Sequence, residues 1–359
     1  MNGLLICSGD GKRKNIGDYI QSVAQEQFLE HVDYYVEREK LDEFCSTQKT
    51  NLIMNGWFMR HPTKFPPSEW INPLFVSFHI VPRNAKKMLT EATISYLKKY
   101  QPIGARDTGT QMLLQSYGID SYFSGCLTLT LGLKYSSEIK DGSIYFVDPY
   151  YEIGIGNRYG KLLRHISALY YSFKYCNKIN KIDSSFTYEF HTSFFRFSKR
   201  IDRILVRSSF YHSYSTLFSD ELLFQAKFVT HSVKQSVFVN DDDKMEYARQ
   251  LLRKYSKARL VITSRIHCGL PCLGIETPVL FVTSNALEGD SVRSSGRFGG
   301  LVDLFHTLRW TEKGIVNTSN LDFSFQKKIG VRTIIKNKEA YKEYKAKLIK
   351  TVSDFLCKG

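Results

Sequence analysis

The chain of 359 residues has 50 lysine and arginine residues against 35 aspartate and glutamate residues, a formal net charge of +15. Its content of 43% hydrophobic and 24% charged residues is typical of a soluble globular protein. No run of about 18 apolar residues occurs, which excludes a membrane-spanning helix, and the length favours two domains. The positive charge suits nucleic acid, phosphorylated small molecules or an anionic membrane surface, and does not choose among them.

Seven cysteines, an odd number, are scattered through the chain. The apolar run Leu4–Cys7 is too short for a secretory signal, so we expect a reduced, cytosolic compartment. Cys268 and Cys272 beside His267 raise the question of a zinc site. Because Pro271 interrupts this apolar segment and no second Cys/His pair has a structural-zinc spacing, we interpret both as small buried cysteines and expect no metal.

The first elements form a strand–loop–helix unit. Leu4–Ser8 is a short apolar strand, Gly9–Asp18 is a loop rich in glycine and charge, and Tyr19–Glu30 has the pattern of an amphipathic helix. The loop follows the carboxyl end of the strand, where ligands bind in parallel sheets. Its spacing is not GxGxxG, so we predict no dinucleotide fingerprint.

Strands and helices then alternate. We predict strands over Asn51–Asn55, Leu74–Ile80, Ile103–Arg106 and Ser121–Cys126, and helices over Lys86–Lys99 and Asp107–Tyr117. Asp107 should cap the second of these helices and Gly118 should close it. This alternation predicts a parallel sheet, and Gly132–Asp141 is the expected junction to a second domain.

The pattern resumes in the second half. We predict strands over Ser143–Asp148, Phe228–His231 and Arg259–Thr263, helices over Asp242–Ser256 and Gly269–Ile275, and a further strand after Pro278. A basic helix, Lys336–Leu356, is expected to pack back across the domains. Two α/β domains with a cleft between them are the simplest architecture.

The segment Arg158–His231 looks different, because aromatic and basic residues interleave in it irregularly. It suits either a membrane-surface patch and a groove for a lipid-linked substrate, or ordinary helices whose lysines and arginines face solvent. The second interpretation is the simpler one.

Two positions carry cations directly after a strand. Arg265 and His267 follow Arg259–Thr263 at the expected start of a helix with a Ser/Thr cap, where backbone N–H groups favour anions. Arg106 occupies the matching place in the first half. An arginine fork binds phosphate or carboxylate bidentately, so the pattern favours a compact ligand with two anionic groups. The alternative is a surface ion-pair residue and a buried hydrogen-bonded histidine.

Several short motifs occur in a fixed order: Asn15-Ile-Gly-Asp18 with Gln21, Asn55-Gly-Trp57, Gly104-Ala-Arg-Asp107 with Thr110, Ser124-Gly-Cys126 with Thr128, and Ser264-Arg-Ile-His267 followed by Pro278. With these motifs the chain resembles the polysaccharide pyruvyl transferase family. The resemblance implies an α/β fold with two Rossmann-like domains in a GT-B-like arrangement and a cleft between them. We place the N-terminal, acceptor-side domain at residues 1–135, the C-terminal, phosphoenolpyruvate-side domain at 141–330, and a helical tail at 331–359.

The resemblance also implies phosphoenolpyruvate as donor and a sugar as acceptor, with a cyclic pyruvate ketal and phosphate as products. Family donor-binding positions correspond to Arg106, Arg265 and His267. Some members use a lysine after the next strand; the loop here has none, and Arg293 or Arg297 is the substitute that we consider. From the same motifs we add Asn15 and Ser264 as substrate-binding residues.

The expected chemistry needs clamps for two anionic groups, a proton donor and a base. We assign His267 to hold phosphate or supply a proton and Asp18 to orient or deprotonate the acceptor hydroxyl; a loop-capping carboxylate is the alternative for Asp18. No cofactor or metal is required. The expected partners are a lipid-linked glycan acceptor and an anionic membrane surface, which gives a cytoplasmic protein on the inner face of the plasma membrane.

Two other functions fit the sequence less well. The same fold serves glycosyltransferases that use a nucleotide sugar, for which Glu276 or Glu288 would contact the donor ribose. A basic binder of nucleic acid would match the charge, but no helix-turn-helix, RNP or zinc-finger pattern is present, so we expect no nucleic-acid partner.

Overall fold

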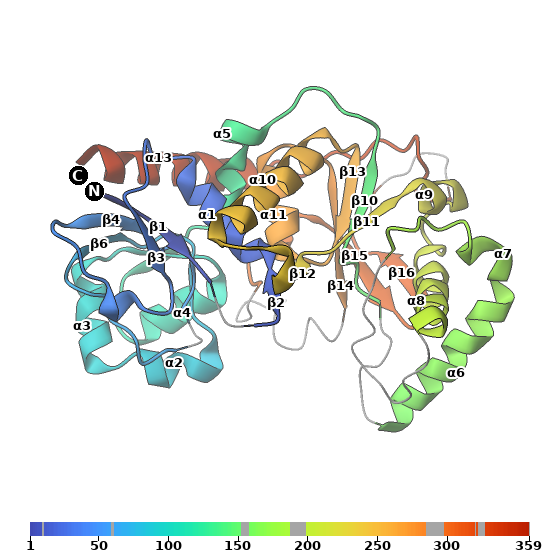
Figure 1. The fold of residues 1–359 in the computed structure, drawn as a ribbon, viewed down its shortest axis with the longest axis horizontal. Helices are drawn as coiled ribbons and strands as arrows, with labels where there is room; N and C mark the ends of the chain where they lie inside the picture. Colours follow the sequence, from blue (N-terminus) through green and yellow to red (C-terminus); the bar gives the residue numbers. More distant parts are fainter. Residues whose placement is uncertain are drawn as a thin grey trace.

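The computed structural model describes residues 1–8, 11–58, 61–151, 158–186, 199–284, 298–319, 321 and 327–358. Two groups of parallel strands lie in opposite halves of the molecule, with helices between and around them (Figure 1). The chain is therefore an α/β protein with several parallel sheets, and the predicted fold class is confirmed at that level.

Two four-stranded sheets form the N-terminal end. Their strand orders are β3-β1-β4-β6 and β5-β7-β8-β9, and all neighbours are parallel. The strands are β1 (Asn2–Ile6), β3 (Tyr34–Glu37), β4 (Thr50–Ile53), β5 (Gly56–Trp57), β6 (Ile71–Leu74), β7 (Phe78–His79), β8 (Ile103–Ala105) and β9 (Ser121–Phe123). The chain runs from β4 in the first sheet into β5 in the second, and from β6 in the first sheet into β7 in the second. Consecutive strands therefore continue from one sheet into the other.

Two elements of this half that we predicted as continuous are interrupted in the structure. The strand expected over Leu74–Ile80 is broken, because Ser77 adopts a φ of 55° in the left-handed region. The helix expected over Lys86–Lys99 is two helices, α2 (Pro82–Met88) and α3 (Glu91–Lys99). Thr90 starts the second one by accepting the N–H of Thr93 at 3.3 Å.

The third helix predicted in this half, over Asp107–Tyr117, agrees with the structure. Helix α4 (Thr108–Ser116) begins after Asp107, whose side chain accepts the N–H of Thr110 at 2.8 Å, and Gly118 follows it with a φ of 68°. The predicted cap is therefore confirmed. The short elements η1 (Leu41–Glu43), η2 (Leu127–Leu131) and α5 (Gly132–Tyr135) complete this half.

The predicted loop Gly9–Asp18 contains regular structure. Strand β2 (Arg13–Asn15) pairs antiparallel with β12 (Ser232–Lys234), which lies more than 200 residues later in the chain. Helix α1 (Ile16–Glu26) then starts three residues before its predicted start, since the side chain of Asn15 accepts the N–H of Gly17 at 3.3 Å. Asp18 consequently lies in the first turn of a helix and not in a loop.

A six-stranded sheet of order β11-β10-β13-β14-β15-β16 forms the other end. Its strands are β10 (Ile144–Val147), β11 (Lys227–Val229), β13 (Leu260–Thr263), β14 (Val279–Ser284), β15 (His306–Thr311) and β16 (Gly314–Asn317). Only the β15–β16 pair is antiparallel. The carboxyl ends of the five parallel strands therefore share one edge, where Asp148, Thr230 and Ser264 directly follow their strands.

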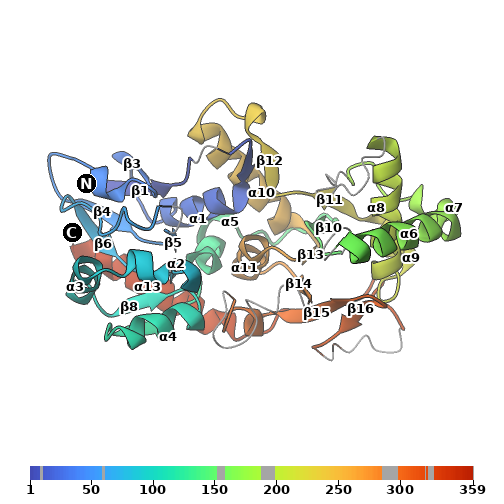
Figure 2. The ribbon, with the colours of Figure 1, turned by 90° about the horizontal axis from the view of Figure 1, so that it is seen from below.

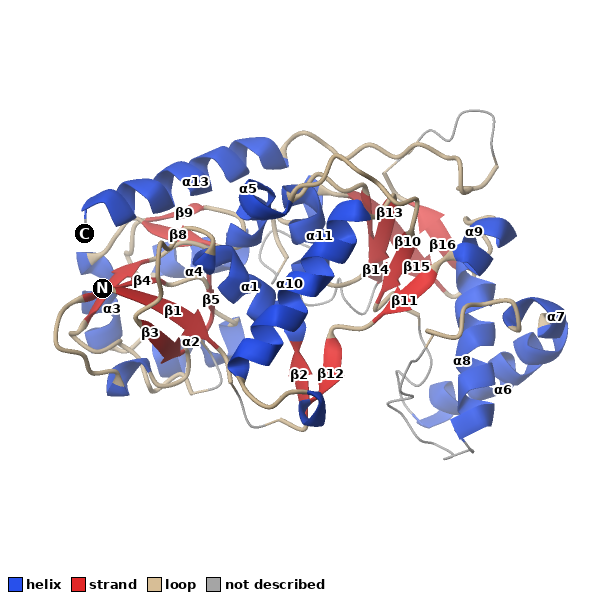
Figure 3. Ribbon diagram, turned by 45° about the horizontal axis from the view of Figure 1, so that its top comes forward, coloured by secondary structure: helices blue, strands red, loops and turns tan. Residues whose placement is uncertain are grey.

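Helices α1, α10 (Asp241–Lys257) and α11 (Ile266–Gly274) lie between the two groups of strands (Figure 3). Their apolar faces form one buried cluster that contains Ile20 of α1, Leu252 of α10 and Leu270 of α11. Cys268 and Cys272 of α11 belong to the same cluster and are fully buried, as predicted. Hydrophobic contact thus joins the first and second halves of the chain. The short elements η3 (Gln235–Val237) and η4 (Val302–Leu304) accompany this half.

The aromatic and basic segment is largely helical where the structure describes it. It forms α6 (Arg158–Lys174), α7 (Cys176–Ile179), α8 (Lys199–Tyr214) and α9 (Asp220–Gln225), at the far end of the molecule from the N-terminus (Figure 1). These helices agree with the simpler of the two interpretations of the segment, and α6 packs against α8. In the described ranges, no helix is both long and apolar enough to cross a membrane.

The C-terminal helix α13 (Tyr341–Lys358) returns to the N-terminal end, where both termini lie in the same region (Figures 1 and 2). The ring of Tyr344 meets that of Phe123 edge to face, at 5.0 Å between centroids. The predicted packing of the tail back across the chain is confirmed, although the helix begins at Tyr341 rather than Lys336.

The contact between α11 and η2 depends on a glycine. A Cβ atom on Gly274 would lie 2.5 Å from the carbonyl oxygen of Leu129, a backbone atom that cannot turn away. We expect Gly274→Ala to lower the free energy of unfolding by about 1–3 kcal/mol in urea titrations, despite the better helix propensity of alanine. Gly56→Ala is the matched control, since its Cβ would approach no atom closer than 3.5 Å. Equal stability of the two variants would contradict this account of the packing.

Candidate active site

Arg106 follows β8 and is almost completely buried, with 1% of its surface exposed. Its Nε lies 3.8 Å from Oδ2 of Asp107, and neither Nε nor Nη2 has a hydrogen-bond partner among the residues that the structure describes. Burial lowers the pKa of the guanidinium, and nearby Arg38 adds to this. A buried cation with unsatisfied N–H groups is costly, so this arrangement is typical of a site that an anion completes.

A buried triad holds the chain beside Arg106. His79 Nδ1 lies 2.6 Å from Oδ2 of Asp107, while Oγ1 of Thr110 donates to Oδ1 of Asp107 at 2.9 Å. Burial by itself would raise the pKa of Asp107, but His79, Arg106 and the N–H of Thr110 together hold that pKa below its usual value. Asp107 therefore stays ionised and fixes the backbone next to Arg106.

Asp18 forms an ion pair that the sequence did not reveal. Its Oδ1 lies 3.5 Å from Nη1 of Arg38, which is buried with its Nη2 2.9 Å from Sγ of Cys7 and its guanidinium 5.7 Å from the centre of the Trp57 ring. Burial opposes the charge on Arg38, but Asp18 and other acidic neighbours raise its pKa. Asp18 also influences the pKa of Arg106, so these three charges belong to one electrostatic cluster.

His267 joins this cluster from the second half of the chain. Nε2 of Gln21 lies 3.4 Å from His267 Nδ1 and 3.3 Å from Oδ1 of Asp18. A Cβ on Gly17 would stand 3.0 Å from Cβ of His267, so only glycine lets the first turns of α1 and α11 approach so closely. His267 itself departs from helical geometry, with φ −82° and ψ 15°, and is 7% exposed.

Arg265 has a different partner. Its Nε lies 3.0 Å from Oδ2 of Asp148, an oxygen that also accepts the N–H of His231. The carbonyl of His231 accepts the N–H of Ile16, so a short chain of hydrogen bonds connects this ion pair to the start of α1. Asp148 adopts a φ of 40°, an unfavourable value for a residue with a side chain.

The Ser/Thr cap predicted for α11 is wrong. Arg265 is the N-cap residue and forms no side-chain cap. The Oγ of Ser264 accepts the N–H of Tyr150 at 2.8 Å, and Oγ1 of Thr263 accepts the N–H of Arg265. Both hydroxyls are thus used to hold the loops at the carboxyl edge of the sheet, which leaves the helix terminus without a side-chain cap.

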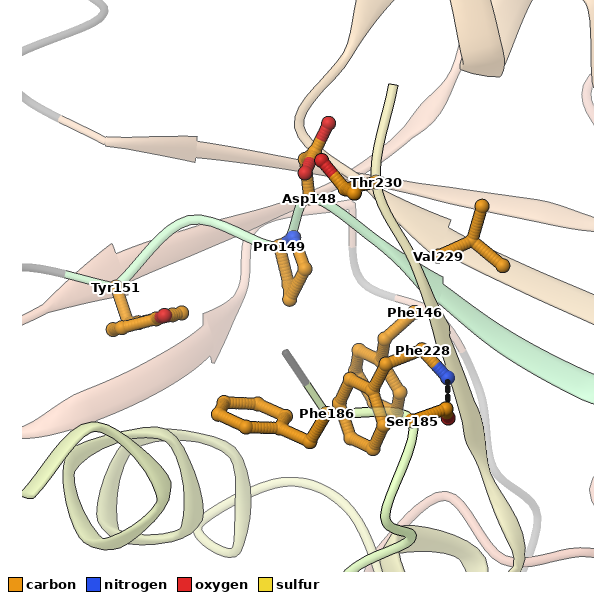
Figure 4. Close-up of a pocket in the computed structure, with 9 residues that line it drawn as sticks. All are labelled: Phe146, Asp148, Pro149, Tyr151, Ser185, Phe186, Phe228, Val229 and Thr230. Carbon is orange, nitrogen blue, oxygen red and sulfur yellow. Dashed lines mark hydrogen bonds between the residues drawn. The ribbon is translucent and has the colours of Figure 1, made fainter. Parts of the chain in front are cut away.

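A small cavity lies below Asp148, between Thr230 and the rings of Phe146, Phe186 and Phe228 (Figure 4). Its volume of about 20 Å³ has room for roughly one water molecule. It is therefore too small for a three-carbon anionic substrate.

The structure brings Asp18 and His267 together around Gln21, with Arg106 electrostatically coupled to Asp18. Asn15 lies beside them, its Nδ2 3.4 Å from Oδ2 of Asp18. Arg265 and Ser264 lie at the start of α11 and contact other partners. Arg293 and Arg297 lie outside the described residues, as does Glu288. Glu276, the alternative ribose ligand, lies 3.6 Å from Lys345 on the surface.

Sequence reasoning missed Arg38 and Asp148. Each directly follows a parallel strand, β3 or β10, which is the same signal that identified Arg106. Arg38 escaped notice because the strand Tyr34–Glu37 is short and was not predicted. The strand that ends at Asp148 was predicted, so the residue at its carboxyl end could have been considered as a site residue.

Cys268 and Cys272 beside His267 raised the question of a zinc site. In the part of the chain with described coordinates, no group of three or more histidine, cysteine or acidic side chains could hold a metal ion. Cys268 instead contacts Cys272 and His231 inside the core. Burial raises the pKa of the Cys268 thiol, but hydrogen bonds with Cys272, His231 and Thr263 outweigh burial and lower that pKa to about 6.

The lowered pKa of Asp107 has a consequence for acid stability. A carboxyl whose pKa is lower in the folded state stabilises the fold above its unfolded pKa, and this contribution is lost as pH falls through the folded pKa. We expect the free energy of unfolding of the native protein to fall more steeply between about pH 5 and pH 2 than that of Asp107→Asn. Urea unfolding at several pH values measures both curves, and parallel curves would contradict the assignment.

The sequence model of the polysaccharide pyruvyl transferase family matches residues 15–285, which is more than half of the chain and includes every motif assembled above. No curated protein and no solved structure shows a significant match. The chain belongs to the polysaccharide pyruvyl transferase family and is a transferase enzyme.

Proposed function

We propose that this protein transfers the pyruvyl group of phosphoenolpyruvate to a sugar of a surface-polysaccharide precursor, forming a cyclic pyruvate ketal and releasing phosphate. The observation that carries the proposal is the buried guanidinium of Arg106, whose Nε and Nη2 lack acceptors among the described residues. Phosphoenolpyruvate offers a carboxylate and a phosphate on three carbons, and either group would satisfy these donors.

The proposal includes a GT-B-like arrangement of two Rossmann-like domains, residues 1–135 on the acceptor side and 141–330 on the phosphoenolpyruvate side, with a helical tail at 331–359. Parallel sheets at opposite ends of the chain support this division (Figure 3). In such sheets ligands bind at the carboxyl ends of strands, where Arg106 and Arg265 both lie.

Each cationic residue has a proposed role toward the donor. Arg106 binds one anionic group and Arg265, oriented by Asp148, binds the other. His267 contacts the phosphate or supplies a proton, and Ser264 lies next to Arg265 at the same strand end. Either Arg293 or Arg297 adds a further contact in place of the lysine of some family members.

The proposed reaction balances without a further reactant. A proton adds to the methylene carbon, which makes C2 electrophilic, and the oxygen of one sugar hydroxyl forms a bond to C2. The bond between C2 and the phosphate oxygen then breaks, and a second hydroxyl closes the ketal. The two sugar hydroxyls release two protons. One restores the acid that protonated the methylene carbon, and the other leaves with phosphate. Asp18, held by Arg38 and Gln21, orients or deprotonates the first hydroxyl.

Arg106→Met tests this assignment. We expect glycan-dependent phosphate release from phosphoenolpyruvate to fall by about 10²-fold or more, because a preorganised donor to the substrate is lost. Thermal stability should stay the same or rise, since the variant removes a buried cation while Asp107 keeps His79 and Thr110. The rise in melting temperature that phosphoenolpyruvate causes in the native protein should disappear.

Arg332→Met, at an exposed position, is the matched control and should behave like the native protein in all three measurements. Stabilisation of the native protein by UDP-glucose and not by phosphoenolpyruvate would contradict the proposed donor.

We propose further that the acceptor is lipid-linked and that the protein binds the inner face of the plasma membrane. Ile166, Tyr170 and Phe173 of α6 are 54%, 60% and 80% exposed, and their spacing of four and three residues places them on one face of the helix. Lys174 follows directly, its Nζ 5.9 Å from the centre of the Tyr170 ring. An exposed apolar stripe beside a cation suits an anionic bilayer surface.

Phe173→Glu should weaken binding to phosphatidylglycerol vesicles by about tenfold or more, because burial of a phenylalanine side chain contributes about 1.5–3 kcal/mol. Vesicle flotation measures the bound fraction. Ile139→Glu is the control, since Ile139 is 77% exposed at a distant position. If Phe173→Glu and Ile139→Glu weakened vesicle binding equally, the added negative charge alone would explain the loss of binding.

A further inference from the structure

A groove of about 460 Å³ lies between α6, α8 and the end of β15. This volume falls within the range of about 300–1,000 Å³ that is typical of small-molecule sites. The groove is distinct from the cluster around Arg106, and no residue of that cluster lines it. It therefore needs an explanation of its own.

Aromatic rings form two of its walls. The ring of Tyr171 stacks on that of His212 at 3.7 Å between centroids and 14° between planes. Across the groove, Trp310 is held in place because its Nε1 donates to Oγ of Ser213 at 3.0 Å. Burial, together with Lys174, lowers the pKa of His212, so its ring is neutral at pH 7. Its Nδ1 lies 3.4 Å from Oη of Tyr175.

Polar side chains complete the lining. Arg164 and Ser167 come from α6, and Glu312 follows β15. Arg164 and Glu312 bring opposite charges to the lining, so the pair has no net charge that would favour an anion, whereas hydroxyl groups can accept from a guanidinium and donate to a carboxylate. Aromatic walls with a few hydrogen-bonding groups match a saccharide, which has an apolar C–H face and a rim of hydroxyls.

The groove is connected to the candidate active site. The ring of Trp310 meets that of Tyr150 at 5.7 Å, and the N–H of Tyr150 donates to Oγ of Ser264, which precedes Arg265. Trp310 and Ser264 also lie at the same carboxyl edge of the six-stranded sheet.

We infer that this groove binds a sugar unit of the acceptor glycan adjacent to the unit that receives the pyruvyl group. The inference rests on the proposed function, because that function supplies the glycan. It deepens the proposal by giving the acceptor a second binding site, so that the enzyme recognises an oligosaccharide rather than a single sugar.

Ser167→Trp tests the inference by filling the groove from an exposed position of α6. Asn177→Trp is the matched control, because it adds the same ring at an exposed position of α7 outside the groove. Maltotriose, lactose and chitotriose are titrated into each full-length protein without phosphoenolpyruvate, and binding is followed by calorimetry. We expect at least one saccharide to bind, with a dissociation constant raised about tenfold or more in Ser167→Trp and unchanged in Asn177→Trp.

Glu312→Gln is a second variant that keeps the shape of the groove and removes only the charge, and it should weaken the same saccharide. Circular dichroism establishes that each variant is folded. If none of the three saccharides binds at millimolar concentration, or if Ser167→Trp binds as tightly as the native protein, the inference is overturned.

Turnover of phosphoenolpyruvate separates this inference from the proposed function. Saccharide binding that Ser167→Trp weakens, without any phosphate release from phosphoenolpyruvate, would sustain the groove and refute the proposed reaction. Phosphate release with the KM for oligosaccharide unchanged by Ser167→Trp would sustain the reaction and refute the groove.

Discussion

The close approach of α1 to α11 is the constraint on which the arrangement of the site depends. Gly17 leaves room for the Cβ of His267, and Gln21 one turn later lies between His267 and Asp18. Asp18 and Gln21 from the start of the chain therefore meet His267 from its second half. A bulkier residue at position 17 would separate the two helices and with them the two halves of the polar cluster.

Charge burial gives this region its chemical character. Arg38 and Arg106 are both buried, and each has an acidic neighbour that offsets part of the desolvation cost: Asp18 for Arg38 and Asp107 for Arg106. Removing an ion from water costs several kcal/mol even after relaxation, so such pairs are retained for specificity or function more readily than for stability. The difference between the two arginines is informative. Asp18 and Cys7 both contact Arg38, whereas Arg106 keeps unsatisfied donors among the described residues.

The six-stranded sheet places two kinds of site along one edge. At its centre, the ends of β10 and β13 carry the Asp148–Arg265 pair, which suits an anion. Toward β15, the same edge carries Trp310 and the aromatic groove, which suits a neutral and amphipathic ligand. The proposed donor, with two negative charges, and the proposed sugar acceptor would match this division of chemistry along the edge.

Local signals were sufficient to identify many elements from the sequence. The strand before Arg106, the Asp107 cap and the long helix near Asp242–Ser256 were identified because hydrophobic period, capping chemistry and breakers all act within a few residues. The alternation of these elements identified the α/β class, whereas the family was identified from the resemblance carried by its ordered short motifs. Errors occurred where a single residue broke an apolar pattern, as Ser77 and Thr90 do, since neither changes the hydrophobic period.

Only the tertiary structure decided which charges meet. Nothing in the local sequence pairs Arg38 with Asp18 or Arg265 with Asp148, and nothing in it predicts that β2 joins β12 across more than 200 residues. The sequence by itself identified the cations that follow β8 and β13, because strand and helix patterns are local. Their partners follow from long-range packing around α1, α10 and α11, which depends on side-chain shapes far apart in the chain.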